Sequence, residues 1–345
     1  MSASLIDQFD ALVRRDPAAR GLISSEPLYG PLCPGHLAQS AADLARSGRH
    51  VAIVTGFFVP DAQTPAAETD GPPGAIVLAI AFESIGIATT LVTDSNCAAA
   101  LRAAANVAGL DLSSIAVCPS VSGESTNESA TRAWTDAFFE DGPGRTLTHL
   151  IAIERVGPSH DEESLVRQPR PGTPPLAEFL AAVPAGHRNR CHNSRGNPID
   201  ASTAPLHLLF ETSPKHPNRP KTIGIGDGGN EIGMGVIPWE DLVRRLPRKE
   251  AACIPCRIAT DWNIIAGTSN WGGFALAAAT LVCANRTDVL APLDADFHRN
   301  LLERMVAEGP AVDGITRRPE PTVDGLPFAT YIQTWMGIRR LIGLE

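Results

Sequence analysis

The sequence predicts an α/β fold in which a layered, mostly parallel sheet is flanked by helices, with the active site at the carboxyl ends of the strands. Short runs rich in β-branched residues alternate with alanine-rich runs of helical length along the middle of the chain. The strand-like runs are apolar almost throughout, which is typical of strands buried on both faces of a parallel sheet. Several of these runs end at an acidic residue, at the edge where folds of this class bind their ligands.

The individual elements follow from these patterns in chain order. An amphipathic helix is expected at the N-terminus, because one helical face carries Leu5, Phe9, Leu12 and Val13. The expected strands are residues 50–58, 88–94, 113–119, 149–157, 221–227 and 257–267. The expected helices of the layered region are residues 74–86, 96–110 and 271–284. Two long irregular connections, typical of functional or mobile loops, are residues 59–74 and 155–175.

Length and charge limit the domain organisation and the partners. We expect one domain over residues 1–345, since no shift in composition marks a linker. The net charge of -9 argues against nucleic acid or an anionic membrane as the partner, because both require a basic surface. The sequence has no apolar run of about eighteen residues and no signal-peptide pattern, so we expect a cytoplasmic protein. Small-residue helices such as 271–284 could pack within the subunit or against a second copy, which leaves a homo-oligomer open.

The cysteines allow two interpretations. Cys253 and Cys256 have the C-x-x-C spacing, and Cys191 with His192 could complete a zinc site. The second C-x-x-C of a zinc ribbon is missing from the sequence. We therefore favour buried, reduced thiols, with residues 251–259 forming a strand.

Acidic residues are expected to meet at one edge of the sheet. Asp94, Glu154 and Asp227 end or follow predicted strands, and Glu68 and Asp70 lie on the loop after the first strand. Carboxylates held together in a partly dry site repel one another, so they need a cation or must take up protons. Their oxygen ligands suit Mn²⁺ or Mg²⁺, with Ca²⁺ as a further option, better than zinc. The alternative is that each acid caps a helix or lies in solvent.

The glycine-rich segment GIGDGGNEIGMG (residues 224–235) has a related interpretation. It contains G-x-G-x-x-G, a pattern of dinucleotide-binding loops, but Asp227 within it would repel a pyrophosphate. Glycines also let a backbone turn tightly. We therefore favour a loop that brings Asp227, Asn230 and Glu231 onto a metal ion or its bound water.

Two further segments carry candidate substrate-binding groups. The turn at residues 266–273 opens a helix that Ser269 or Asn270 is expected to cap, and its backbone N–H groups could hold an anion. Arg195 lies among turn-forming residues and could grip a carboxylate, although a lone arginine is as often a surface charge. The substrate-binding candidates are Thr55, Gly56, Arg195, Gly267, Thr268, Ser269 and Asn270.

Together, several segments resemble the D-glutamate cyclase family, and more narrowly its C-terminal domain. They are residues 55–57, 68–75, 91–94, 152–157, 193–196, 222–235, 266–273 and 322–328, so the resemblance spans most of the chain. It implies a divalent cation in an acidic cavity and conversion of D-glutamate to 5-oxo-D-proline with loss of water. For archaeal relatives of this domain a manganese-dependent phosphatase activity has been proposed. In the animal enzyme a hydro-lyase-like domain precedes this one, and this sequence contains none of it.

The expected function is therefore a metal-dependent lyase acting on an acidic amino acid. The alternatives are a phosphatase for a small phosphorylated metabolite and a non-catalytic metabolite or metal sensor. The catalytic candidates are Glu68, Asp70, Asp227 and Glu231. The candidate metal ligands are Asp94, Glu154, Asp227, Asn230 and Glu231.

Overall fold

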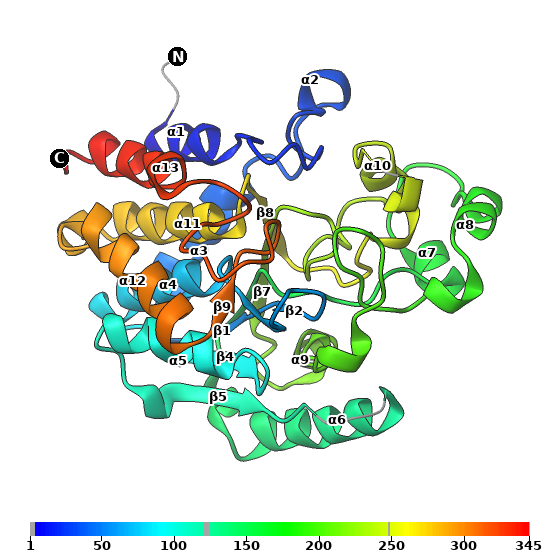
Figure 1. The fold of residues 1–345 in the computed structure, drawn as a ribbon, viewed down its shortest axis with the longest axis horizontal. Helices are drawn as coiled ribbons and strands as arrows, with labels where there is room; N and C mark the ends of the chain where they lie inside the picture. The colour runs from blue at the N-terminus through cyan, green and yellow to red at the C-terminus, as the bar shows by residue number, and fades with distance from the viewer. Residues whose placement is uncertain (1–3, 121–123, 248, 345) are drawn as a thin grey trace.

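The centre of the protein is a six-stranded parallel sheet. The computed structural model describes residues 4–120, 124–247 and 249–344. The strands lie in the order β5-β4-β1-β6-β7-β8, and each neighbouring pair is parallel (Figure 1). The layered α/β fold with a parallel sheet is therefore confirmed. Its strands are β1 (His50–Thr55), β4 (Ala88–Asp94), β5 (Ile115–Cys118), β6 (His149–Ile153), β7 (Lys221–Gly226) and β8 (Trp262–Ile265).

Helices cover both faces of this sheet. One face packs on α1 (Leu5–Val13), α3 (His36–Ser47), α4 (Pro72–Ser84), α5 (Ala98–Val107), α11 (Ser269–Cys283), α12 (Ala295–Glu308) and α13 (Phe328–Leu341). The other face packs on α6 (Glu124–Glu140), α9 (His207–Thr212) and α10 (Trp239–Val243). The remaining short helices are α2 (Glu26–Tyr29), α7 (Glu162–Arg167) and α8 (Leu176–Ala182). In the described ranges, we find no helix with the length and apolar character that a membrane crossing requires.

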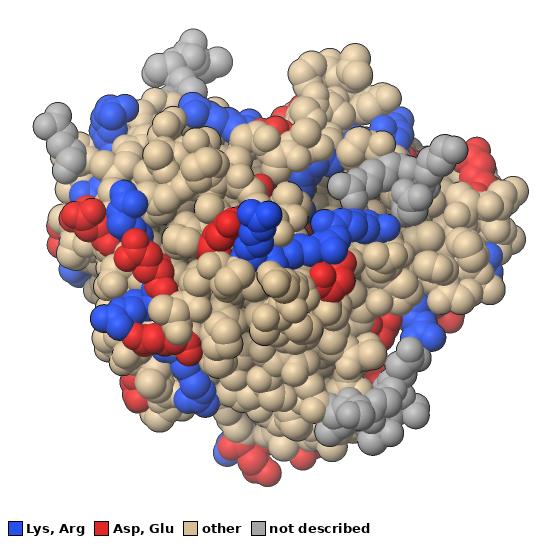
Figure 2. Space-filling view, viewed as in Figure 1, with Lys and Arg blue, Asp and Glu red and all other residues tan. Residues whose placement is uncertain are grey.

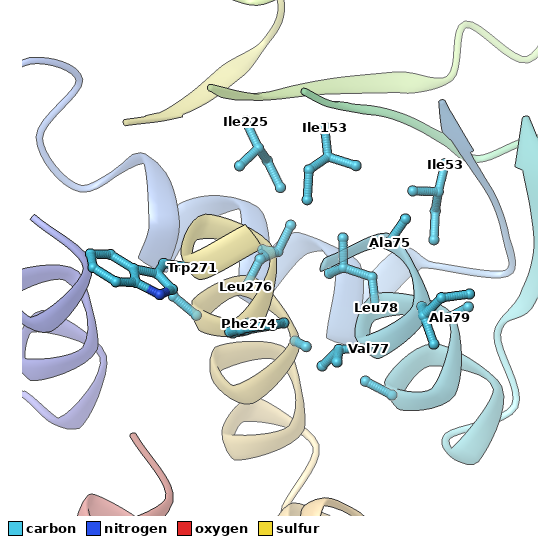
Figure 3. Packing of buried hydrophobic residues seen from close by; sticks show 14 of the residues in the cluster. Ile53, Ala75, Val77, Leu78, Ala79, Ile153, Ile225, Trp271, Phe274 and Leu276 are labelled. Atoms are coloured by element: carbon cyan, nitrogen blue, oxygen red, sulfur yellow. The ribbon is translucent and has the colours of Figure 1, made fainter. Parts of the chain in front are cut away.

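The strands are apolar on both sides because each side meets a helical layer. Along β1, Ile53 faces one hydrophobic cluster, and its neighbours Ala52 and Val54 face the other. Figure 3 shows the first cluster, in which Ile53, Ile153 and Ile225 project from adjacent strands toward α4 and α11.

Glycines allow α4 and α11 to pack closely beneath the sheet. A Cβ atom added at Gly273 would lie 2.8 Å from Cδ1 of Ile153 and 3.0 Å from Cα of Gly74. Replacing Gly273 by alanine is expected to lower the free energy of unfolding by up to about 2 kcal/mol, because crowding costs about 1–3 kcal/mol and the gain in helix propensity offsets about 1 kcal/mol of it. Urea unfolding followed by circular dichroism measures the change.

The matched control is Gly337→Ala in α13. There the nearest atoms belong to the flexible Leu12 side chain, at 3.2 Å or more from the added Cβ. We expect this variant to be as stable as the wild type or more stable. Equal stability of the two variants would contradict the close packing of α4 on α11.

A second, small sheet explains one difference from the predicted strands. The strand expected at 50–58 ends as β1 at Thr55, and Phe58–Val59 forms β2 in a separate sheet of order β2-β3-β9. Gly56, with a φ of +109°, turns the chain between the two strands. The other strands of the small sheet are β3 (Ala66–Glu68) and β9 (Ala311–Val312).

The strand expected at residues 251–259 is wrong. Lys249–Cys253 is a 3₁₀ helix, and Cys256 pairs with Ser159 only in an isolated bridge. Pro255 lacks the N–H group that a continuous ladder would need there. Cys253 and Cys256 are both buried, reduced cysteines.

Candidate functional site

Carboxyl groups from separate parts of the chain meet at the carboxyl edge of the large sheet. Glu154 directly follows β6 and Asp227 directly follows the neighbouring β7. Glu154, Asp227 and Glu231 form one triad, and Asp70, Asp227 and Asp324 form a second. In each triad, one carboxylate oxygen from every member lies within 4.8 Å of the others. Burial raises the pKa of Glu68, and the charges of Asp324 and Asp70 add to the effect.

Asp227 belongs to both triads, and its carboxylate is buried. Neither of its carboxylate oxygens has a hydrogen-bond partner among the described residues, although only 2% of the residue is exposed. The nearest cation is Arg20, whose Nε lies 3.5 Å from Oδ2 of Asp227. Oδ2 of Asp324 is likewise buried without a partner in the described ranges. Buried, unpartnered carboxylate oxygens within a few ångströms of one another fit a hard divalent cation such as Mn²⁺ or Mg²⁺.

The glycine-rich loop after β7 holds one of its own carboxylates. Oε1 of Glu231 accepts hydrogen bonds from the N–H groups of Asp227, at 3.0 Å, and Gly228, at 2.6 Å. Oε2 accepts one from Gly229, at 2.8 Å, a residue whose φ of +96° suits glycine. The N–H groups that would cradle a phosphate in a nucleotide-binding loop therefore bind Glu231 instead.

The N-terminus of α11 is used in the same way. Its N-cap is Thr268 rather than the expected Ser269 or Asn270, since Oγ1 of Thr268 accepts the N–H of Trp271. The N–H groups of Ser269 and Asn270 each donate to Asp70, at 2.8 Å. We expected this turn to hold a substrate carboxylate, but the structure fills it with the carboxylate of Asp70. The hydroxyl of Ser269 also donates to Glu154, at 2.6 Å.

Other predicted substrate-binding residues support the backbone around the site. Gly267 donates its N–H to the carbonyl of Val13, at 2.9 Å. Thr55 is fully buried, and the carbonyl of Gly56 accepts a hydrogen bond from Arg155. Asn230, a predicted metal ligand, donates from its side-chain amide to the carbonyl of His192, at 2.8 Å.

Asp94, a predicted metal ligand, lies outside both triads. Its Oδ2 pairs with Nη2 of the buried Arg155 at 2.7 Å and accepts the N–H of Ala204. The sheet order gives the reason: β4, which ends at Asp94, is separated from β6 by β1. The strand-end pattern placed Asp94 at the correct edge but could not show that a strand lies between it and Glu154.

A pocket connects the acidic cluster with the surface. The buried residues Glu68, Glu154 and Asn230 and the partly exposed Arg195 line it. Arg195 is partly exposed and pairs with Asp61, at 3.2 Å. On the face drawn in Figure 2, basic and acidic side chains are interspersed rather than gathered into patches of one sign. The other residues of the wall include Arg20, Phe57, Val59, Asn193 and Gly314.

Burial and mutual repulsion raise the pKa of most carboxyls in the cluster. Burial raises the pKa of Glu154 well above its usual value, and the nearby charge of Glu231 adds to the effect. Burial also raises the pKa of Asp227, while the guanidinium of Arg20 partly offsets this. For Asp70, burial and Asp324 raise the pKa to about 8 although α11 donates two hydrogen bonds to it. The cluster therefore retains protons at neutral pH when no cation neutralises it.

The backbone is strained at two of these acids. Glu154 has a φ of +45° and Asp324 a φ of +54°, in the left-handed region that residues with side chains rarely adopt. Such strain concentrates at functional sites, where surrounding contacts hold it in place. It supports a role for these two residues beyond packing.

Comparison with known proteins places this site in a family. The family described as D-glutamate cyclase-like, C-terminal, matches residues 9–166 and 180–339. The chain belongs to the D-glutamate cyclase-like family. It is similar to a human protein named D-glutamate cyclase, mitochondrial, with 29% identity over 285 residues. The match covers 80% of this chain and 39% of the human protein, so the chain spans well under half of that relative's length.

Sequence reasoning missed two residues of the site in this family member. Arg20 comes from the segment between α1 and α2, and Asp324 comes from the loop before α13. Asp324 lies in a segment, residues 322–328, that carried part of the family resemblance, which was the available signal. No motif marked Arg20, because its partners Asp227 and Asp324 lie about two hundred or more residues away in sequence.

The raised pKa values predict how the stability of the metal-free protein depends on pH. The folded-state pKa of Asp70, about 8, exceeds the usual 3.8, so stability is lost as pH rises toward 8. Buried His160 and His207 have pKa values lowered from 6.5 to about 3, which destabilises the fold only below pH 6.5. Between pH 6.5 and pH 8 we therefore expect the free energy of unfolding to fall by about 1 kcal/mol per pH unit or more.

Urea unfolding at the two ends of this pH window, with a chelator present, measures the effect. Saturating Mn²⁺ is expected to remove most of it, because a bound cation favours the ionised carboxylates. Equal stability at both pH values in chelator would contradict a cluster that holds protons.

Proposed function

We propose that this chain is a divalent-metal-dependent lyase that converts D-glutamate to 5-oxo-D-proline and water. The observation that carries the proposal is the buried carboxylate of Asp227, which accepts no hydrogen bond from the described residues. It is shared by two carboxylate triads, one of which includes the pocket-lining Glu154. Membership of the D-glutamate cyclase-like family supports the substrate class. The name of the human relative supports the reaction.

The residues that would hold the ion are the members of the two triads. Asp227 would contribute to either position, with Glu154 and Glu231 on one side and Asp70 and Asp324 on the other. When bound, the cation would supply a Lewis acid that makes the side-chain carboxyl group of glutamate a better electrophile. Asn230 could contribute its side-chain oxygen, because the amide nitrogen donates to the carbonyl of His192 and leaves Oδ1 available on the pocket wall.

Proton transfer is assigned to Glu68. The reaction moves two protons from the ammonium nitrogen to the oxygen that leaves as water, while the nitrogen forms a bond to the side-chain carboxyl carbon. Glu68 lies on the pocket wall, and burial and the charge of Asp324 raise its pKa, so it binds a proton more tightly than an ordinary carboxylate does. Asp70 is less suited, because both of its oxygens accept hydrogen bonds from α11.

Arg195 would bind the α-carboxylate at the outer end of the pocket. Its guanidinium can form a bidentate pair with a carboxylate after giving up Asp61, its partially exposed partner. Holding the α-carboxylate there while the side chain points to the acids would fold glutamate back on itself. Ring closure is intramolecular, so this positioning supplies a large part of the rate enhancement.

The phosphatase alternative has less support in the site. The loop after β7 and the N-terminus of α11 are the backbone anion sites expected for phosphoryl oxygens, and protein carboxylates occupy both. Purified protein incubated with Mn²⁺ and D-glutamate, L-glutamate or a phosphate ester separates the alternatives by product analysis. We expect 5-oxo-D-proline from D-glutamate alone. Release of phosphate without 5-oxoproline would favour a phosphatase, and tight binding without any product would favour a sensor.

A further inference from the structure

A second cavity is lined by residues 188–191, close in sequence to Asn193 of the first pocket. It has a volume of about 500 Å³, within the range of small-molecule sites, and shares no lining residue with the pocket of the acidic cluster. It opens between α6, α9 and the loop at residues 188–191, and Figure 1 shows α6 and α9 side by side at one edge of the molecule. Four arginines contribute to its wall: Arg132, Arg188, Arg190 and Arg257.

Two buried polar groups in the cavity wall have no hydrogen-bond partner in the part of the chain that the structure describes. Nδ1 of His207 and the hydroxyl of Thr203 are buried and have no hydrogen-bond partner among the described residues. His207 is 9% exposed and Thr203 is 5% exposed. A buried polar atom without a partner is costly, so two of them in the wall of one cavity indicate a ligand that bonds to them.

The charges around the cavity favour an anionic ligand. Its acidic side chains each lie beside an arginine: Glu211 pairs with Arg257 at 2.6 Å, Glu128 with Arg132 at 3.0 Å and Asp200 with Arg190 at 3.9 Å. Arg188 adds a fourth guanidinium and pairs with Glu162, which is outside the lining. The guanidiniums of Arg257, Arg155 and Arg132 add to burial in lowering the pKa of His207 to about 3, which indicates a positive potential at its ring.

We propose that this cavity binds a small oxyanion, a carboxylate or a phosphate, held by Arg257 with Thr203 and His207. Guanidinium groups bind both anions through paired N–H donors. The hydroxyl of Thr203 and, in its Nδ1–H tautomer, the neutral ring of His207 supply the remaining donors. Cys191 lines this cavity and Asn193, two residues along, lines the pocket of the acids, so an anion bound here contacts the segment that forms part of the candidate active site.

Isothermal titration with inorganic phosphate and, separately, with glutarate tests the proposal. A chelator is present throughout, so that the acidic cluster is free of metal and repels both anions. We expect saturable one-to-one binding of at least one probe, and the probe that binds distinguishes phosphate from carboxylate recognition. A control titration with sodium chloride at the same ionic strength corrects the measured heats for nonspecific screening by salt.

Two variants connect the binding to the cavity. The first is the double variant Arg257→Gln with Glu211→Gln, which removes an ion pair and leaves the net charge of the protein unchanged. The second, Thr203→Val, removes one hydroxyl at nearly constant volume. Each is expected to weaken binding by about tenfold. The matched control, Arg304→Gln with Glu308→Gln, removes an exposed pair on α12 that lines no cavity described above and should bind as the wild type does. Circular dichroism verifies that each variant is folded.

Absence of saturable binding of both probes to the wild type would overturn the proposal. Wild-type affinity in both cavity variants, or equal weakening in the control, would overturn it as well. Because the titration uses metal-free protein and needs no turnover, failure of the proposed lyase activity would leave this result unaffected.

Discussion

Replacing Asp227 by asparagine is expected to abolish divalent-cation binding without destabilising the metal-free protein. Asp227 is the carboxylate common to both triads, so its loss removes a ligand from either position. Loss of groups that only support a ligand typically costs about 10–100-fold in metal affinity, and loss of the ligand itself should cost at least about 100-fold. Titration of the chelator-treated protein with Mn²⁺ measures the change.

The stability of metal-free Asp227→Asn shows whether Asp227 serves as a metal ligand or is needed for folding. Burial raises the pKa of Asp227, so the fold favours its neutral form, and asparagine is a neutral side chain of similar shape. At pH 8 in chelator we expect the variant to be as stable as the wild type or about 1 kcal/mol more stable. Turnover of D-glutamate should fall together with metal affinity.

Asp288→Asn is the matched control for this experiment. Its side chain is 70% exposed and pairs with Arg286 at the surface. We expect it to change neither metal affinity nor stability by a measurable amount. Wild-type Mn²⁺ affinity in Asp227→Asn would exclude the triads as the metal site.

The sequence could place this site at the carboxyl edge of the sheet, but it could not show which strands are neighbours there. Parallel strands end at one edge of a sheet, and that geometry brings Glu154 and Asp227 together because β6 and β7 are neighbours. The order of strands follows from tertiary packing rather than from local sequence. For that reason Asp94, which ends β4, lies beside Arg155 and apart from the triads.

The functions of backbone N–H groups were harder to predict than the positions of acids. The start of α11 was predicted to offer N–H groups to an anion, and the glycine loop was predicted to bring its acids onto a metal ion. Their occupants, Glu231 and Asp70, became visible only in three dimensions, because a carboxylate from the same chain competes with any ligand for those donors.

Replacing Arg20 by glutamine is expected to have a large effect on metal affinity and stability. Both changes are opposite in sign to those expected for Asp227→Asn. The guanidinium of Arg20 pairs with Asp324 and lies 3.5 Å from Asp227, so it is the cation that the cluster has when no metal is bound. It also lowers the pKa of Glu68, Asp70 and Glu154. Arg20→Gln should therefore destabilise the metal-free protein by about 3 kcal/mol, since removing one partner leaves buried carboxylates uncompensated.

The same variant should bind Mn²⁺ more tightly than the wild type and gain more stability from it. Without the competing guanidinium, we expect Mn²⁺ affinity to rise by about tenfold, and saturating Mn²⁺ to raise the melting temperature of Arg20→Gln more than that of the wild type. Arg20→Lys keeps the charge and should resemble the wild type in both measurements. If Arg20→Gln instead binds Mn²⁺ more weakly, its guanidinium organises the ligands rather than substituting for the metal. If the variant has unchanged Mn²⁺ affinity and a raised KM for D-glutamate, Arg20 binds the substrate and does not neutralise the acidic cluster.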